Sequence, residues 1–234
     1  MKTLFLGNSH TYMNDMPYLF RTLYHDSFGT GNEAVMLAYS GRSLEWHMKE
    51  YMSLRYQLLY GRFDHCIIQQ AAHPFPEEGT TMENGKKIIE LCRKCGTEPV
   101  LFMTWAEKRS PENQQKMIEV FEKLAAETGV KLAPVGLVWQ KVQQEYPEIE
   151  LYFEDGEHAS PYGDLLIAMT LCRTLHPADE IVLPDRIIDY QVVWDEYPSA
   201  SLDDTRFIPC DHETAACIRN AVEEITGTYR YLKQ

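Results

Sequence analysis

The feature that most constrains this chain is a regular alternation between short apolar runs and longer amphipathic segments. Five runs have the length and composition of buried strands, and they cover 3–6, 34–38, 65–69, 99–104 and 130–135. The segments with apolar residues at helical spacing cover 15–24, 43–59, 83–95, 111–128, 137–146 and 161–175. Strands that alternate with helices form βαβ units and a mostly parallel sheet. We therefore expect an α/β protein, a three-layer α/β/α sandwich around a flavodoxin-like five-stranded parallel sheet.

The point at which this alternation stops predicts the domain organisation. The chain has 234 residues, which is the size of one large domain. The alternation stops after the last of these helices, so we expect residues 1–176 to form the core. Residues 177–234 contain one more amphipathic segment, from about 211 to 225, and no linker-like composition. We expect them to form a C-terminal helical extension that packs on the same domain.

The charge balance narrows the classes of partner. Lys and Arg number 22 against 35 Asp and Glu, which gives a formal net charge of −13. Nucleic acids and anionic membranes attract basic surfaces, so we expect neither as a partner. No apolar run approaches the roughly 18 residues of a membrane span. The first expected strand begins almost directly after Met1, without a signal peptide. We therefore expect a cytoplasmic protein whose six cysteines are free thiols.

Ser9 is the first candidate for chemistry. The segment Gly7-Asn8-Ser9-His10 follows the first expected strand directly. In parallel sheets of this kind ligands bind beyond the carboxyl ends of the strands. Backbone N–H groups at the start of the following helix can stabilise an oxyanion there. The same segment also suits an ordinary helix cap, so Ser9 becomes a candidate nucleophile only if a base lies nearby.

Asp155 and His158 are the candidate partners of that serine. They lie in the segment 155–158, shortly before the helix expected at 161–175. A carboxylate three residues before an imidazole can reach it within one turn and fix its tautomer. A capped helix start with a surface histidine is the alternative. Ser160-Pro161 supplies a good cap and first helical residue, so we expect the turn to hold His158 at the sheet edge.

Three more strand ends carry groups that suit acyl transfer. Gly41 follows the second expected strand and can offer its backbone N–H to an oxyanion, although a turn glycine is common at this point. Gln69 and Gln70 end the third strand, where a buried carboxamide needs hydrogen-bond partners. Trp105 follows the fourth strand, where it can wall a substrate pocket or pack in the core.

Taken together, these segments resemble the SGNH/GDSL hydrolase superfamily over roughly residues 3–175. Gly7-Asn8-Ser9 is similar to the Gly-x-Ser block after the first strand in that family. Gly41 is similar to the glycine of the second block, and Asp155-x-x-His158 to the Asp-x-x-His block before the last helix. The resemblance implies a Ser9–His158–Asp155 triad. It also implies an oxyanion hole that includes the N–H groups of Ser9 and Gly41.

Two segments depart from the family pattern. Asn8 stands where the family usually has Asp before the nucleophile. The third block, usually Gly-x-Asn-Asp, is Gln69-Gln70-Ala71-Ala72-His73-Pro74 in this chain. Branches of the family with a Gln in this block use it in place of the Asn. The resemblance therefore implies Gln69 as the side-chain oxyanion donor, with Gln70 and His73 as alternatives. The candidate substrate-binding residues are Asn8, His10, Gln70, His73 and Trp105.

The activity that the resemblance implies is that of a serine esterase. Its substrates would be small-molecule or glycan acyl esters, with O-acetyl groups on carbohydrate as one candidate. The alternatives are an acyltransferase and a non-catalytic carbohydrate-binding or scaffolding module. The implied mechanism requires no cofactor, and the lack of a Gly-x-Gly-x-x-Gly or P-loop motif argues against nucleotide binding by those routes. No metal is expected either, because the Cys92-x-x-Cys95 pair has no second pair at zinc spacing.

Overall fold

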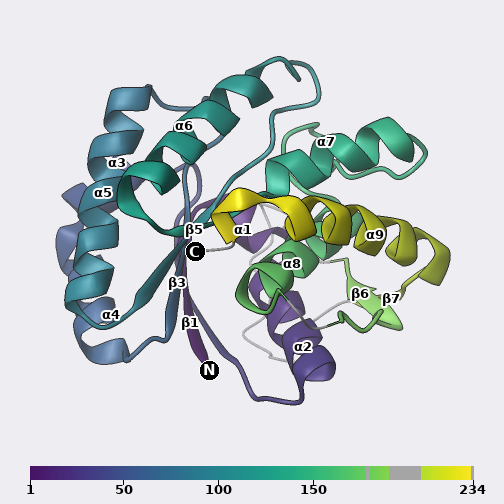
Figure 1. Cartoon of the computed structure of the whole chain (residues 1–234), viewed down its shortest axis with the longest axis horizontal. Coiled ribbons are helices and arrows are strands. Elements are labelled where there is room, and N and C mark those ends of the chain that lie inside the picture. The colour runs from purple at the N-terminus through teal and green to yellow at the C-terminus, as the bar shows by residue number, and fades with distance from the viewer. Residues whose placement is uncertain (178–179, 190–206, 233–234) are drawn as a thin grey trace.

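A parallel sheet of five strands forms the centre of the molecule (Figure 1). The computed structural model describes residues 1–177, 180–189 and 207–232. The strands pair in the order β2-β1-β3-β4-β5, which is that of a flavodoxin-like sheet. They are β1 Lys2–Gly7, β2 Glu33–Ala38, β3 His65–Gln69, β4 Glu98–Phe102 and β5 Lys131–Ala133. All five lie where the sequence predicts strands, so the expected α/β fold is confirmed.

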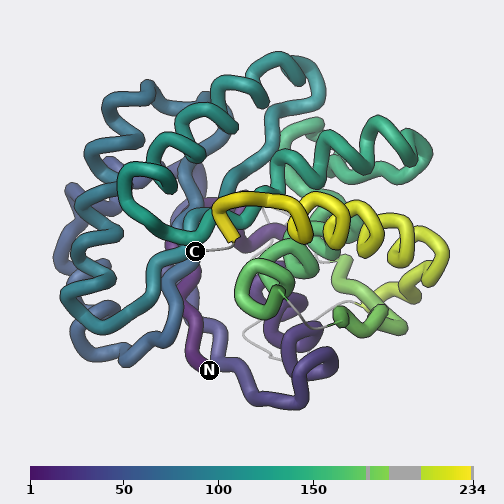
Figure 2. The backbone as a smooth tube through the Cα atoms, viewed as in Figure 1, coloured from purple at the N-terminus to yellow at the C-terminus, as the bar shows by residue number. Residues whose placement is uncertain are grey.

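Helices cover both faces of the sheet (Figures 1 and 2). Because side chains alternate along a strand, Leu4 and Leu6 of β1 pack into one layer and Phe5 into the other. The layer over Leu4 contains α3 Leu44–Lys49, α4 Tyr51–Gly61, α5 Glu78–Lys94 and α6 Asn113–Thr128. The layer over Phe5 contains α2 Met16–Phe28, α7 Val135–Glu145 and α8 Pro161–Leu175. The sheet edge that carries Ser9 therefore lies between two helical layers.

Most of the C-terminal segment packs outside the second layer, and its last turn packs in the core of the first layer. It contains a two-stranded antiparallel ribbon, β6 Arg186–Ile188 with β7 Phe207–Pro209, and then α9 His212–Thr228 and the 3₁₀ turn η2 Arg230–Leu232. Ile218, Ala221 and Val222 of α9 are buried in the same core as α8. Figures 1 and 2 show α9 lying beside α8, and η2 contacts β5. The extension thus contains a ribbon as well as the expected helix.

Two local interruptions differ from the expected helices. The single helix expected at 43–59 is divided into α3 and α4 at Glu50, whose φ and ψ are −84° and 38°. The apolar spacing continues across this break, so periodicity does not reveal it. A short helix, α1 Ser9–Tyr12, and a 3₁₀ turn, η1 Met13–Asp15, precede α2. They are separate from α2 because Asn14 and Asp15 adopt left-handed backbone conformations, with φ of 47° and 54°.

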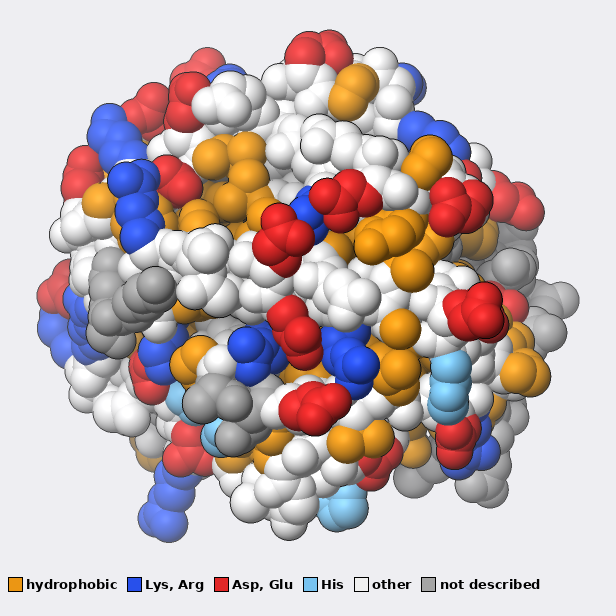
Figure 3. All heavy atoms as spheres, turned by 45° about the vertical axis from the view of Figure 1, so that its right-hand side comes forward, with side chains coloured by type: hydrophobic (Ala, Val, Ile, Leu, Met, Phe, Trp, Pro, Cys, Tyr) orange, Lys and Arg blue, Asp and Glu red, His pale blue; other side chains and the backbone are white. Residues whose placement is uncertain are grey.

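The surface carries the net negative charge without one dominant acidic patch on the face shown in Figure 3, where acidic and basic side chains are interspersed. Many of these charges pair, as Lys141 does with Glu145 and Glu224 on the α7–α9 side. Within the described ranges, no helix has the length and apolar character needed to cross a membrane.

Candidate active site

The turn between β1 and α1 places Ser9 at the carboxyl end of the sheet. Gly7 ends β1, and a Cβ atom there would lie 2.2 Å from Gln69 Oε1 and 2.4 Å from Thr11 Oγ1. Only glycine leaves room for this close approach. Asn8 caps α1, because its side-chain oxygen accepts the His10 backbone N–H at 3.0 Å. Ser9 is therefore held as the first residue of α1.

The loop before α8 presents His158 toward Ser9. An isolated bridge joins Tyr152 to Ala159, and the Phe153 N–H donates to the His158 carbonyl at 2.8 Å. Asp155 Oδ1 accepts the backbone N–H groups of Glu157 and His158 at 2.8 and 2.9 Å. The loop ends where the Ser160 hydroxyl caps α8, as the sequence predicts. These bonds fix the backbone on both sides of His158.

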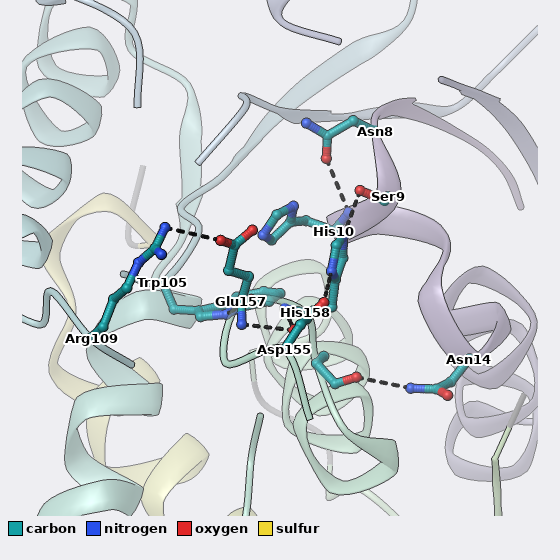
Figure 4. Close-up of polar contacts among 10 residues, drawn as sticks. Asn8, Ser9, His10, Asn14, Trp105, Arg109, Asp155, Glu157 and His158 are labelled. Atoms are coloured by element: carbon teal, nitrogen blue, oxygen red, sulfur yellow. Dashed lines mark hydrogen bonds and ion pairs between the residues drawn. The ribbon is translucent and has the colours of Figure 1, made fainter. Parts of the chain in front are cut away.

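Ser9, His158 and Asp155 form one hydrogen-bonded chain (Figure 4). Ser9 Oγ lies 2.8 Å from His158 Nε2, although the residues are 149 positions apart. His158 Nδ1 lies 2.6 Å from Asp155 Oδ2. An ionised carboxylate only accepts hydrogen bonds, so Nδ1 carries the proton and the Nε2 lone pair faces the serine hydroxyl. This arrangement can remove a proton from Ser9 and stabilise the imidazolium that results.

The exposure of the three side chains suits this chemistry. Ser9 is 5% exposed, while the His158 side chain is 14% and the Asp155 side chain 40% exposed. Partial burial favours the neutral form of Asp155. The hydrogen bonds from the His158 ring and from the Glu157 and His158 N–H groups outweigh this effect and lower its pKa. Asp155 is therefore ionised at neutral pH, as the orientation of His158 requires.

Two backbone N–H groups at this end of the sheet have no acceptor among the described residues, those of Ser9 and of Gly41. Gly41 lies in the exposed loop after β2, with φ of +66°. The Asn8 side chain donates to the Arg42 carbonyl at 3.1 Å and so ties this loop to the serine turn. β1 and β2 are neighbours in the sheet, which brings both loops to one edge. Both N–H groups are therefore candidates for binding an oxyanion.

The expectation that Gln69 donates to the oxyanion needs correction. Its Nε2 donates to the Gln70 carbonyl, and its Oε1 accepts the Asn8 N–H at 2.8 Å and the Thr11 hydroxyl at 3.0 Å. The Asn8 N–H fixes the orientation of this amide, because a donor must face an oxygen. Gln69 is 1% exposed. It braces the turn that carries Ser9 instead of facing an open site.

Of the two alternatives in the third block, Gln70 is already bonded within the fold, whereas His73 stays a candidate donor. Gln70 is fully buried, its Oε1 accepts the N–H groups of Leu44 and Ala71, and its Nε2 donates to Thr81. His73 is half-buried and precedes a cis proline, Pro74. Burial lowers the pKa of His73 to about 4. Its Nε2 is buried without a partner among the described residues.

Most of the residues expected to bind substrate are buried close to Ser9 and His158. Asn8, His10, Gln70 and Trp105 are all at most 5% exposed. The His10 ring packs on His158, with 4.8 Å between the ring centroids, and the Trp105 indole donates to the Glu157 carbonyl. The Asn8 and Gln70 amides and the Trp105 indole are bonded within the fold, whereas both ring nitrogens of His10 have no partner among the described residues. For Asn8, Gln70 and Trp105 these bonds favour a supporting role over direct contact with substrate, and His10 and His73 stay candidates for such contact.

Sequence reasoning missed two residues of this region, Asn14 and Asp164. Asn14 lies at the end of the α1–η1 segment and Asp164 in the first turn of α8, and both are 1% exposed. Their side chains bond each other. A signal was present, because an Asp directly before the apolar run 165–169 is costly to bury unless it has a partner. Within the part of the chain that the structure describes, no group of three or more His, Cys, Asp or Glu side chains could hold a metal.

Comparisons with known proteins agree on the fold. No protein-family profile and no curated protein sequence matches the chain. A lipase/acylhydrolase from Enterococcus faecalis matches with a TM-score of 0.63 at 15% identity, over 79% of this chain and 100% of that one. Axe2, an acetylxylan esterase from Geobacillus stearothermophilus, matches with 0.61 at 13% identity, over 74% and 92%. TesA matches with 0.61 at 15% identity, over 76% and 99%. These likenesses support the three-layer architecture expected from the sequence.

Proposed function

We propose that this chain, which has the fold of the SGNH hydrolases, is a carboxylic ester hydrolase with Ser9 as its nucleophile. The 2.8 Å contact between Ser9 Oγ and His158 Nε2 carries the proposal. Ser–His contacts of this length, with the imidazole held by a carboxylate, activate a hydroxyl for attack on a carbonyl. The structural neighbours support the same class, since they include an acylhydrolase and an esterase.

The reaction proceeds in two steps. Ser9 Oγ attacks the ester carbonyl while His158 Nε2 takes its proton, and the carbonyl oxygen becomes an oxyanion. The N–H groups of Ser9 and Gly41 donate to that oxyanion. His158 then gives its proton to the leaving alkoxide, which departs as the alcohol and leaves an acyl-serine. Water, deprotonated by His158, attacks this ester and releases the carboxylic acid and free Ser9.

Small acyl esters are the proposed substrates, with O-acetyl groups on a carbohydrate as the candidate to test first. The support for carbohydrate comes from Axe2, which is an acetylxylan esterase of the same fold. The acidic net charge of −13 favours neutral esters over anionic ones, because like charges repel.

Hydrolysis of p-nitrophenyl acetate and of acetylated xylo-oligosaccharides tests the proposal. We expect turnover by the wild-type protein and a decrease in kcat of about 10⁶-fold in Ser9→Ala, as is typical when a triad member is removed. Ser53→Ala, an exposed serine of α4, is the matched control and retains full activity. Equal rates for Ser9→Ala and wild type would refute the proposal. Adding methanol separates hydrolysis from acyl transfer, because a transferase forms methyl acetate in place of acetate.

A further inference from the structure

Asn14 has an unusual backbone and a buried side chain. Its φ and ψ are 47° and 25°, in the left-handed region, and the residue is 1% exposed. Asn tolerates this conformation better than most residues do. The conformation ends the short segment that begins at Ser9 and lets α2 start in a new direction. The Asn14 side chain thereby points away from its own helix and toward the loop before α8 (Figure 4).

The Asn14 amide joins the two segments of the triad. Its Nδ2 donates to the Ala159 carbonyl at 3.0 Å and to Asp164 Oδ2 at 2.8 Å. Ala159 directly follows His158, and Asn14 lies in the segment that Ser9 begins. A buried hydrogen bond between these two segments limits how far Ser9 and His158 can separate.

Asp164 sets the direction of this amide. It is 1% exposed, and its Oδ1 has no hydrogen-bond partner among the described residues. Burial raises the pKa of this carboxyl well above its ordinary value, although the Asn14 bond lowers it, and the charge of Asp15 adds to the increase. A neutral carboxyl avoids the cost of a buried charge. Its Oδ2 accepts one Nδ2–H of Asn14, which leaves the other directed at Ala159.

We propose that Asn14 is a positioning residue for the reaction proposed above, and that its hydrogen bond to the Ala159 carbonyl holds His158 Nε2 within reach of Ser9 Oγ. Asn14 does not touch the reacting atoms. It acts through the backbone of the histidine loop. A displacement of about 1 Å between reacting groups can cost about 10²-fold in rate. Even a small movement of His158 away from Ser9 therefore lowers kcat.

Asn14→Gly is the primary variant. Glycine keeps the left-handed backbone of residue 14 and deletes only the amide. With p-nitrophenyl acetate we expect kcat to fall by about 10²-fold while KM stays within about twofold, since substrate contacts are unchanged. The matched control is Asn32→Gly, because Asn32 is also buried and bonds Thr3 at the opposite end of the sheet. We expect Asn32→Gly to lower the melting temperature and leave kcat unchanged.

An exchange of the amide and the carboxyl between positions 14 and 164 separates positioning from stability. In Asn14→Asp the residue-14 side chain loses both donated bonds, so stability and kcat fall together. Adding Asp164→Asn restores a bond between the two side chains with its direction reversed. Because the amide N–H at position 164 then stabilises the ionised carboxylate at position 14, that side chain has no donor for the Ala159 carbonyl. We expect the melting temperature of the double variant to recover and its kcat to remain low. Recovery of kcat with stability would refute the proposal.

Crystal structures of wild type and Asn14→Gly provide a test that does not depend on activity. We expect the Ser9 Oγ–His158 Nε2 distance to exceed about 3.5 Å in the variant, beyond hydrogen-bond range. An unchanged distance together with a kcat within about twofold of wild type would overturn the positioning role. A wild-type protein without esterase activity would instead overturn the proposed function, and the structures would still decide what Asn14 holds in place.

Discussion

Individual buried histidines shape the environment of the triad. His10 lies between His73 and His158, with ring centroids 4.9 and 4.8 Å apart. Burial lowers the pKa of His10 well below its ordinary value, and the charges of His158 and His73 lower it further. A neutral ring at this position would not repel the imidazolium that the proposed reaction forms on His158. In the proposed reaction, His10 would thus add no positive charge beside His158.

The first prediction concerns the acid stability that His10 controls. An unfolded histidine has a pKa of about 6.5, and the folded value is lower. As the pH falls below about 6.5, His10 binds a proton in the unfolded chain but not in the folded protein. The free energy of unfolding therefore decreases. His10→Phe keeps a ring and removes the titration. Urea unfolding at several pH values between 4 and 7 is expected to show a shallower decrease for the variant. Equal slopes would contradict the assignment.

The second prediction concerns Asp164, for which stability changes with pH in the opposite direction. Its folded pKa is raised, so its contribution to stability is complete below the unfolded value of about 3.9 and is lost as the pH rises through the folded pKa. Asp164→Asn cannot ionise and still accepts from Asn14. We expect the variant to gain stability relative to wild type between pH 5 and 8 in thermal unfolding. A difference that is constant with pH would show that folding does not raise the pKa of Asp164.

At the scale of elements, the turns after β1, β2 and β3 are bonded together at the sheet edge that carries Ser9. The turn after β1 carries Ser9, the loop after β2 carries Gly41, and the Gln69 and Gln70 amides at the end of β3 tie these turns together. Gln69 bonds the first turn through Asn8, and Gln70 bonds the start of α3 through Leu44. The two glutamines are thus the buried braces of this sheet edge.

The third prediction tests the close packing of the β1 turn. Gly7→Ala puts a methyl group 2.2 Å from Gln69 Oε1, so the brace must move. We expect a stability loss of about 1–3 kcal/mol, typical of overpacking, and a reduced kcat because Ser9 shifts with the turn. Gly227→Ala in α9 is the control, since a Cβ there meets nothing within 4 Å. A Gly7→Ala protein with wild-type stability and kcat would show that the turn adapts freely.

At this scale, the sequence predicts the features that depend on local residue patterns. It does not predict those that depend on contacts between residues far apart in the chain. The strands, and the helix at 161–175, follow from local apolar periodicity, and the structure has them within two residues. The proximity of Ser9 to His158 follows from both residues lying at one edge of a parallel sheet. The partners of Gln69 do not follow, because an amide's bonds depend on three-dimensional neighbours such as Thr11. The left-handed backbone of Asn14 does not follow either, because its side chain bonds Ala159, which is distant in the sequence.

At the scale of the whole molecule, the C-terminal helix belongs to the core that supports the triad. α9 packs on α7 and α8, and α8 follows the histidine loop directly. Trp139 of α7 stacks on Trp105 with 4.3 Å between the ring centroids, and Trp105 donates to the Glu157 carbonyl in the loop that carries His158. Packing of α9 on these helices links the end of the chain to the position of His158.

The fourth prediction follows from the packing of α9 on α7 and α8. Ile218 of α9 is fully buried, and Ile218→Ala is expected to cost about 2–5 kcal/mol. If the core and the C-terminal segment unfold as one unit, the tryptophan signal in near-ultraviolet circular dichroism and the helical signal in the far ultraviolet shift to one lower midpoint. Two separate midpoints, with only the smaller one shifted in the variant, would show that the C-terminal segment is an independent unit.

The central claim is that Ser9 is the hydroxyl that His158 activates. Labelling with a fluorophosphonate ester tests it most directly, because the reagent phosphonylates a serine only where a base and an oxyanion site assist. Mass spectrometry of the digested protein should find one adduct, on the peptide that contains Ser9. The adduct should be absent in Ser9→Ala and form far more slowly in His158→Ala. An unmodified Ser9 peptide in the folded wild-type protein, or equal labelling of wild type and His158→Ala, would contradict the account.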